Sequence, residues 1–87
     1  MSEGNGVRAD MRDYIEENYL YLYPGTTLKD DDDFLTLGIV DSLGFVELVG
    51  EVQSRYGIPV EDIEITEENF GSIAAIEGYV ERKRTAA

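Results

Sequence analysis

Apolar residues recur at helical spacing in three stretches of the chain. The first covers residues 7–22 and predicts a helix that Pro24 and Gly25 end. The second, residues 42–56, predicts an amphipathic helix of about four turns. The third, residues 72–84, predicts a last helix. The expected inward residues are Val7, Met11, Ile15, Tyr19 and Leu22, then Phe45, Leu48, Val49, Val52 and Tyr56, and finally Ile73, Ile76, Tyr79 and Val80. The pattern predicts an all-α fold.

The connection between the first two helices, residues 26–40, is long and acidic. It carries the run Asp30–Asp33. An EF-hand calcium loop would need further acids, but counted from Asp30 its fifth and sixth positions are Phe34 and Leu35. We therefore expect a solvated acidic run without a specific metal site. Four apolar residues can fold this loop back over the helices: Phe34, Leu35, Leu37 and Ile39.

The second connection begins at Gly57, which suits the end of a helix. Residues 60–65 then predict an extended segment that buries Ile63 and Ile65. Thr66 can cap a short helical turn through Phe70, which Gly71 ends, and Ser72 can cap the last helix. The basic residues Arg82, Lys83 and Arg84 then complement the dipole of that helix.

Charge and composition exclude several classes of function. Nineteen acidic against seven basic residues give a net charge of −12, which disfavours nucleic acids and anionic membranes. The chain has no cysteine and no histidine, so Ser-His and Cys-His catalysis are absent, and we expect no enzyme activity. No apolar run is long enough to span a membrane. We expect a cytoplasmic monomer formed by one domain, residues 1–87, with disordered ends at residues 1–6 and 85–87.

The pair Asp41-Ser42 stands where the second helix begins. Asp41 is suited to cap that helix by accepting hydrogen bonds from backbone N–H groups of its first turn. Capping alone would explain the pair, and modification of the Ser42 hydroxyl would be compatible with it. Because the chain supplies no base for Ser42, another enzyme would have to activate the hydroxyl.

The stretch Gly38-Ile39-Val40-Asp41-Ser42-Leu43, followed by Val46-Glu47-Leu48-Val49, resembles the acyl carrier protein family. The resemblance implies a four-helix bundle with a long first loop and a short third helix. It implies that a phosphopantetheinyl transferase moves 4′-phosphopantetheine from coenzyme A to Ser42, and that the arm then carries an acyl or aminoacyl group as a thioester. Asp41, Leu43 and Val46 would help to present the hydroxyl.

The resemblance also implies partners that load and use the cargo. These are an adenylating or acyl-loading enzyme and an acyltransferase or synthase, which would dock at Leu43, Val46, Glu47 and Glu51. Met11, Phe45 and Ile65 would line a shelter for the cargo between helices.

Departures from the fatty-acid carriers favour a specialised carrier. Two residues separate Gly38 from Asp41 where that group has one, and Arg55 reverses the charge expected on the exposed side of the helix. Uncharged residues replace other expected acids or a methionine: Gly44, Gly50, Gln53 and Ser54. The sequence looks closer to D-alanyl and other stand-alone carriers. The alternative is a module that is never modified and presents its second helix to a partner.

Overall fold

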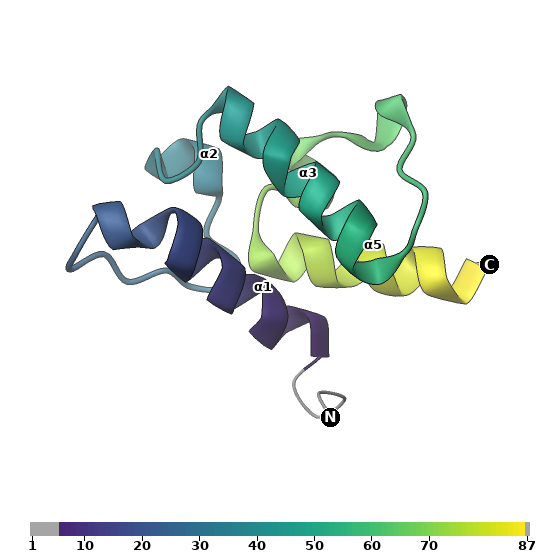
Figure 1. Ribbon diagram of the computed structural model, residues 1–87, viewed down its shortest axis with the longest axis horizontal. Coiled ribbons are helices and arrows are strands. Elements are labelled where there is room, and N and C mark those ends of the chain that lie inside the picture. The colour runs from purple at the N-terminus through teal and green to yellow at the C-terminus, as the bar shows by residue number, and fades with distance from the viewer. Residues whose placement is uncertain (1–5, 87) are drawn as a thin grey trace.

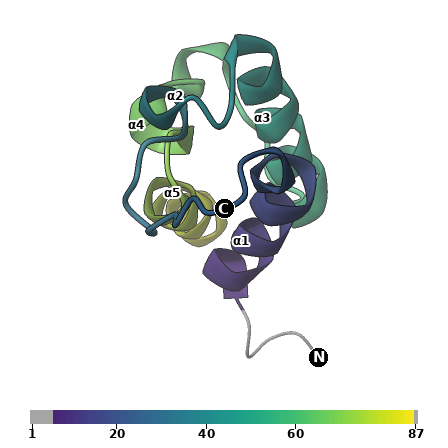
Figure 2. The same ribbon diagram turned by 90° about the vertical axis from the view of Figure 1, so that its left-hand side faces the viewer.

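A computed structural model describes residues 6–86, and within them every regular element is helical. The α-helices are α1 (Gly6–Asn18), α2 (Phe34–Leu37), α3 (Ser42–Tyr56), α4 (Glu67–Phe70) and α5 (Ile73–Ala86), and two 3₁₀ helices, η2 (Leu20–Leu22) and η3 (Asp62–Glu64), lie between them. The long helices α1, α3 and α5 surround the core, with α2 and α4 at one side (Figures 1 and 2). The all-α prediction is confirmed.

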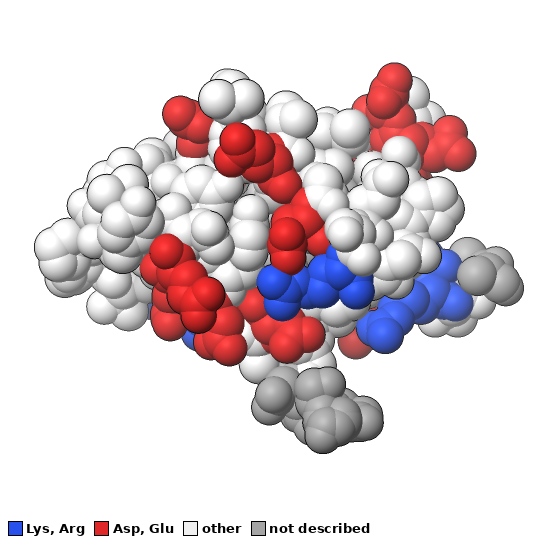
Figure 3. All heavy atoms as spheres, viewed as in Figure 1, with Lys and Arg blue, Asp and Glu red and all other residues white. Residues whose placement is uncertain are grey.

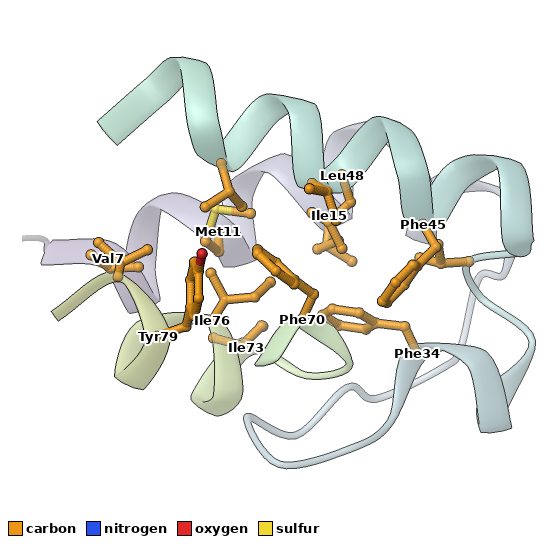
Figure 4. Packing of buried hydrophobic residues seen from close by; sticks show 14 of the residues in the cluster. Val7, Met11, Ile15, Phe34, Phe45, Leu48, Phe70, Ile73, Ile76 and Tyr79 are labelled. Carbon is orange, nitrogen blue, oxygen red and sulfur yellow. The ribbon is translucent and has the colours of Figure 1, made fainter. Parts of the chain in front are cut away.

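The apolar face predicted for each long helix packs into one common core (Figure 4). The predicted inward residues that are buried are Val7, Met11, Ile15, Phe45, Leu48, Val49, Val52, Ile73, Ile76, Tyr79 and Val80. From the short helices, Phe34 of α2 and Phe70 of α4 join them with no exposed surface. The ring of Phe70 lies edge-on to Phe45 with centroids 6.5 Å apart. An aromatic contact therefore fastens α4 to α3, and Phe34 anchors α2 in the same core.

The first predicted helix ends earlier than its apolar period suggests. The α-helical segment stops at Asn18, and the chain continues as a 3₁₀ turn in which Leu22 is 60% exposed. The Asn18 side-chain amide donates to the carbonyl of Tyr14 at 2.9 Å, which is the kind of local bond that competes with helix continuation. The expectation that the helix runs to Leu22 with that side chain inward was wrong.

The long acidic connection contains a helical turn that its sequence did not indicate. Asp33 caps α2 by accepting from the backbone N–H groups of Leu35 and Thr36, and Gly38 ends it in the left-handed region at φ 75°. Phe34 and Ile39 are buried as expected, but Leu37 is 48% exposed. A turn of helix directs only part of its residues inward, so Leu37 contributes less than the other three apolar residues to folding this connection back over the helices.

The acidic run is only partly a solvated strip. The Asp30 carboxylate pairs with Arg8 and, at 2.6 Å, with Arg12, and Arg8 also binds Glu77 of α5. These guanidinium groups hold the pKa of Asp30 below its usual range. Asp33 is a helix cap. Among residues 6–86 no group of three or more acidic residues is arranged to hold a metal ion.

Two backbone hydrogen bonds tie the same connection to the far end of the chain. The carbonyl of Asp30 accepts from the N–H of Ala74, and the N–H of Phe34 donates to the carbonyl of Gly71, each at 2.8 Å. These residues are more than 35 positions apart in the sequence. The path into α3 is therefore set by contacts with the start of α5.

The expected extended segment before α4 is also corrected. Its centre forms η3, closed by a capping box between Glu61 and Glu64, and this turn directs Ile63 outward at 87% exposure. Ile65 is half-buried against the core. The predicted caps Thr66 and Ser72 are confirmed, since their hydroxyl oxygens accept from Asn69 and Ala75.

The disorder expected at residues 1–6 and 85–87 stays a prediction. Gly6 begins α1, and residues 85–86 belong to α5. Residues 1–5 and 87 lie outside the described part. None of the helices between residues 6 and 86 has the length and apolar character that crossing a bilayer requires.

Candidate functional site

The side chain of Asp41 determines where α3 begins. Its backbone is extended (φ −92°, ψ −176°), and its Oδ1 atom accepts from the N–H of Gly44 at 2.8 Å. The residues before it, Ile39 and Val40, are both buried, so the chain enters the helix from an anchored position. Ser42 is the first residue of the helix and is exposed. The predicted cap is confirmed, and the serine hydroxyl is accessible from outside.

Apolar side chains lie beside this serine on the outer face of α3. Leu43 is 69% exposed and Val46 60%, and Glu47 is exposed next to them. Glu51 is half-exposed and accepts from the guanidinium of Arg55 at 2.6 Å. The predicted docking residues therefore share one outward surface, and the only base of α3 is engaged with an acid of the same helix.

The Ser42 hydroxyl is suited to receive a group that another enzyme transfers to it. The chain contains no imidazole or thiol that could deprotonate it, and the Asp41 carboxylate is already bonded to the helix backbone. The N-terminus of a 15-residue helix favours a negatively charged group because its first N–H groups lack intrahelical partners. An exposed hydroxyl at this position can receive a phosphate-bearing group from another enzyme.

Tyr19, which sequence reasoning assigned only to the core stripe, supports the turn that carries Ser42. Its hydroxyl donates to the carbonyl of Gly44 at 3.3 Å, and burial raises its pKa above the usual range. A Cβ atom added at Gly44 would lie 3.1 Å from a ring carbon of Tyr19 and 3.2 Å from Val40. The glycine thus allows the end of α1 to approach α3 closely. A glycine two positions after the serine was the one sequence signal for this contact.

A surface hollow of about 250 Å³ is lined by Asp41, the residue that precedes the serine. One wall comes from the end of α1 and η2, with Asn18, Tyr19, Leu22 and Tyr23, and the other from residues 38–41. Residues 18–28, which include the first wall, carry no charged side chain. The left-hand end of the molecule in Figure 3, where the end of α1 lies, shows only white surface. Sequence reasoning did not find this hollow because its walls are brought together only by the fold.

The three residues expected to line a cargo shelter lie in or against the core. Met11 has no exposed surface, Phe45 is 9% exposed, and Ile65 is half-buried. All of them contact the cluster of buried side chains that joins α1, α3 and α5. The contact with cargo stays a prediction.

Comparison with known proteins identifies the family. The model of the family described as "Phosphopantetheine attachment site" matches residues 7–80. The D-alanyl carrier proteins of Streptococcus pyogenes serotype M5 (strain Manfredo) and serotype M1 are each 31% identical over 77 residues, covering 83% of this chain and 98% of theirs. No solved structure gives a significant match. The chain therefore belongs to the family of acyl and aminoacyl carrier proteins, whose domain is the attachment site of a covalent 4′-phosphopantetheine arm.

Proposed function

We propose that Ser42 holds the phosphopantetheine arm. The observation that carries this proposal is the exposed serine at the first position of α3, directly after the capping carboxylate of Asp41. Leu43 and Val46 provide an uncovered apolar surface beside it, which a transferase can contact while it delivers the arm. Asp41 would act as a positioning residue, because its bond to Gly44 sets the helix start.

The test is the intact mass of the purified chain after incubation with coenzyme A and a phosphopantetheinyl transferase of broad specificity. The wild-type chain should gain one phosphopantetheine, and Ser42→Ala should gain none. Ser54→Ala is the matched control, because Ser54 is exposed on the same helix and its loss should leave the addition intact. Addition to Ser42→Ala would overturn the assignment.

We further infer that the cargo is an aminoacyl or small specialised acyl group, loaded by an adenylating enzyme. The relatives at 31% identity are named D-alanyl carriers, and the spacing of two residues between Gly38 and Asp41 also favours that class. Loading tests it: the arm-bearing chain should gain an aminoacyl mass with an adenylating enzyme, ATP and an amino acid. Efficient charging by a fatty-acyl loading enzyme alone would contradict it.

A carrier of this kind works as a substrate of other enzymes and not as a catalyst. Tethering raises the effective concentration of cargo at each partner's active site. We propose that transferases and synthases approach the surface of Leu43, Val46, Glu47 and Glu51, and that they do so in the cytoplasm with the carrier as a monomer. Charge reversal at Glu47 should slow loading and transfer while the protein stays folded, and unchanged rates would remove Glu47 from the docking surface.

The exposed pair Leu43 and Val46 also favours the alternative of an unmodified interaction module. That module would bind its partner equally well with Ser42→Ala and lose binding with Val46→Asp. The carrier proposal expects both variants to lose transfer, the first through the missing arm and the second through docking.

A further inference from the structure

The hollow beside α3 has a composition that suits an uncharged, amphipathic chain. Its walls combine the aromatic and aliphatic residues Tyr19, Leu22, Tyr23 and Ile39 with Gly38 and the polar residues Asn18 and Asp41, and no lysine or arginine lines it. Sites for small molecules are mostly apolar, with a few polar groups that fix orientation. The walls therefore offer apolar contact together with a small number of hydrogen-bond acceptors.

Two acceptor atoms remain available on residues that line this hollow. The Asn18 amide nitrogen donates to Tyr14, which leaves its Oδ1 atom for another donor, and Asp41 uses Oδ1 for Gly44, which leaves Oδ2. Within residues 6–86 the structure shows no hydrogen bond to either remaining oxygen. A ligand with amide N–H groups would match them, and none of the lining residues carries a positive charge that would pair with an anionic ligand.

We propose that the phosphopantetheine arm has a resting position in this hollow, on the side of α3 that faces η2. The inference rests on the proposed attachment at Ser42, because the wall residue Asp41 is its immediate neighbour in the chain. Pantetheine is an uncharged chain with a dimethyl carbon, a hydroxyl and two amides. Its dimethyl carbon packs on Leu22 and Tyr23, and its amides donate to Asn18 and Asp41.

The size of the hollow fits a segment of the arm and not the arm with a long cargo. Its volume of about 250 Å³ is below the range of roughly 300–1,000 Å³ usual for pockets that enclose a drug-sized ligand. A shallow site of this kind would bind a free ligand weakly. Attachment one residue away supplies an effective concentration in the millimolar range, so weak contacts suffice to populate the resting position.

The resting position has a consequence for transfer. An arm laid between η2 and residues 38–41 covers Leu22, which is 60% exposed, and Tyr23, which is 41% exposed. It is at the same time unavailable to an enzyme docked on Leu43 and Val46. Docking then draws the arm out by shifting the balance between the two positions. The aromatic wall would therefore govern how readily the carrier delivers its cargo.

The test uses isotope-labelled protein with an unlabelled arm, first checked by intact mass for complete addition at Ser42. Nuclear Overhauser effects from the arm's dimethyl protons should reach the side chains of Leu22 and Tyr23. The double variant Leu22→Ser with Tyr23→Ala should lose these effects. Ile63→Ser is the matched control, since Ile63 is also exposed and belongs to η3, outside the hollow, and it should keep them.

Effects confined to Val46 or Ile65, or none from the dimethyl protons to the protein, would overturn the resting position. If the arm fails to add to Ser42 at all, the proposed function fails first, and the mass spectrum separates the two failures. If the double variant does not fold, the wild-type spectrum still decides the question.

Discussion

The Oδ1 atom of Asp41 lies 2.8 Å from the backbone nitrogen of Gly44 and closes the first turn of α3. Replacing Asp41 with alanine leaves that N–H without a capping acceptor. We expect Asp41→Ala to lower the free energy of unfolding by about 1 kcal/mol, while Asp41→Asn retains most of the cap. Urea denaturation of the three chains measures the difference. Equal midpoints for all three would show that this bond does not stabilise the helix start.

Two glycines of α3 should respond differently to alanine. A Cβ atom at Gly50 meets nothing within 4 Å, and its backbone is helical, so Gly50→Ala should stabilise the fold by about 1 kcal/mol. At Gly44 the same Cβ atom would press on Tyr19, Asp41 and Val40. We therefore expect Gly44→Ala to gain less or to destabilise. Thermal unfolding compares the two, and an equal gain would contradict the close approach of Tyr19.

Phe34 connects the one-turn helix α2 to the core. Its side chain is fully buried in the cluster with Phe45 and Phe70 (Figure 4). Phe34→Ala should cost about 3–5 kcal/mol, which is a large part of the stability of a domain of this size. Leu37→Ala on the same helix is the control and should cost under about 0.5 kcal/mol, since Leu37 is 48% exposed. Similar losses from both would show that α2 is not held by its phenylalanine.

The free energy of unfolding should depend on pH through the Glu64 carboxyl group. The backbone N–H of Glu61, then Lys83 and Tyr79, donate to its carboxylate and lower its pKa from 4.5 to about 2. Since the folded pKa lies below the unfolded one, the contribution is complete above about pH 4.5 and is lost as the pH falls towards 2.

The difference in unfolding free energy between wild type and Glu64→Gln should therefore shrink over that interval. The other acidic residues also become protonated in this interval, which reduces their mutual repulsion. They do so in both chains, so their effect cancels when the two unfolding free energies are subtracted. Carboxyl titration by nuclear magnetic resonance gives the Glu64 pKa directly. A titration near 4.5 would contradict the bonds to Glu61 and Lys83.

The sequence predicted the long helices well because each carries a full apolar period and explicit end signals. Residues 42–56 form α3 with the expected cap at Asp41, and Gly57 ends it in the left-handed region at φ 61°. The same helical spacing of apolar residues predicted that Leu43 and Val46 point outward, and both are exposed. Identification of the candidate serine needed only this local information and the motif around it.

The short elements were harder because tertiary contacts decide them. Asp33 looked like one acid in a run, yet it caps a turn that Phe34 anchors. Ile63 was expected to be buried because it is apolar, but it is exposed. Its neighbour Glu64 makes the contact with α5 instead, through Lys83 and Tyr79. The hollow lined by Asp41 forms because η2 lies close to residues 38–41, and no local sequence pattern predicts that proximity.

The bonds from Asp30 to Ala74 and from Phe34 to Gly71 have a consequence for protein synthesis. A ribosome makes Ser42 some thirty residues before Gly71 and Ala74, the partners that fix the path into α3. A truncated or nascent chain lacks those partners. We therefore expect chains that stop before Gly71 to be poor substrates for the modifying enzyme.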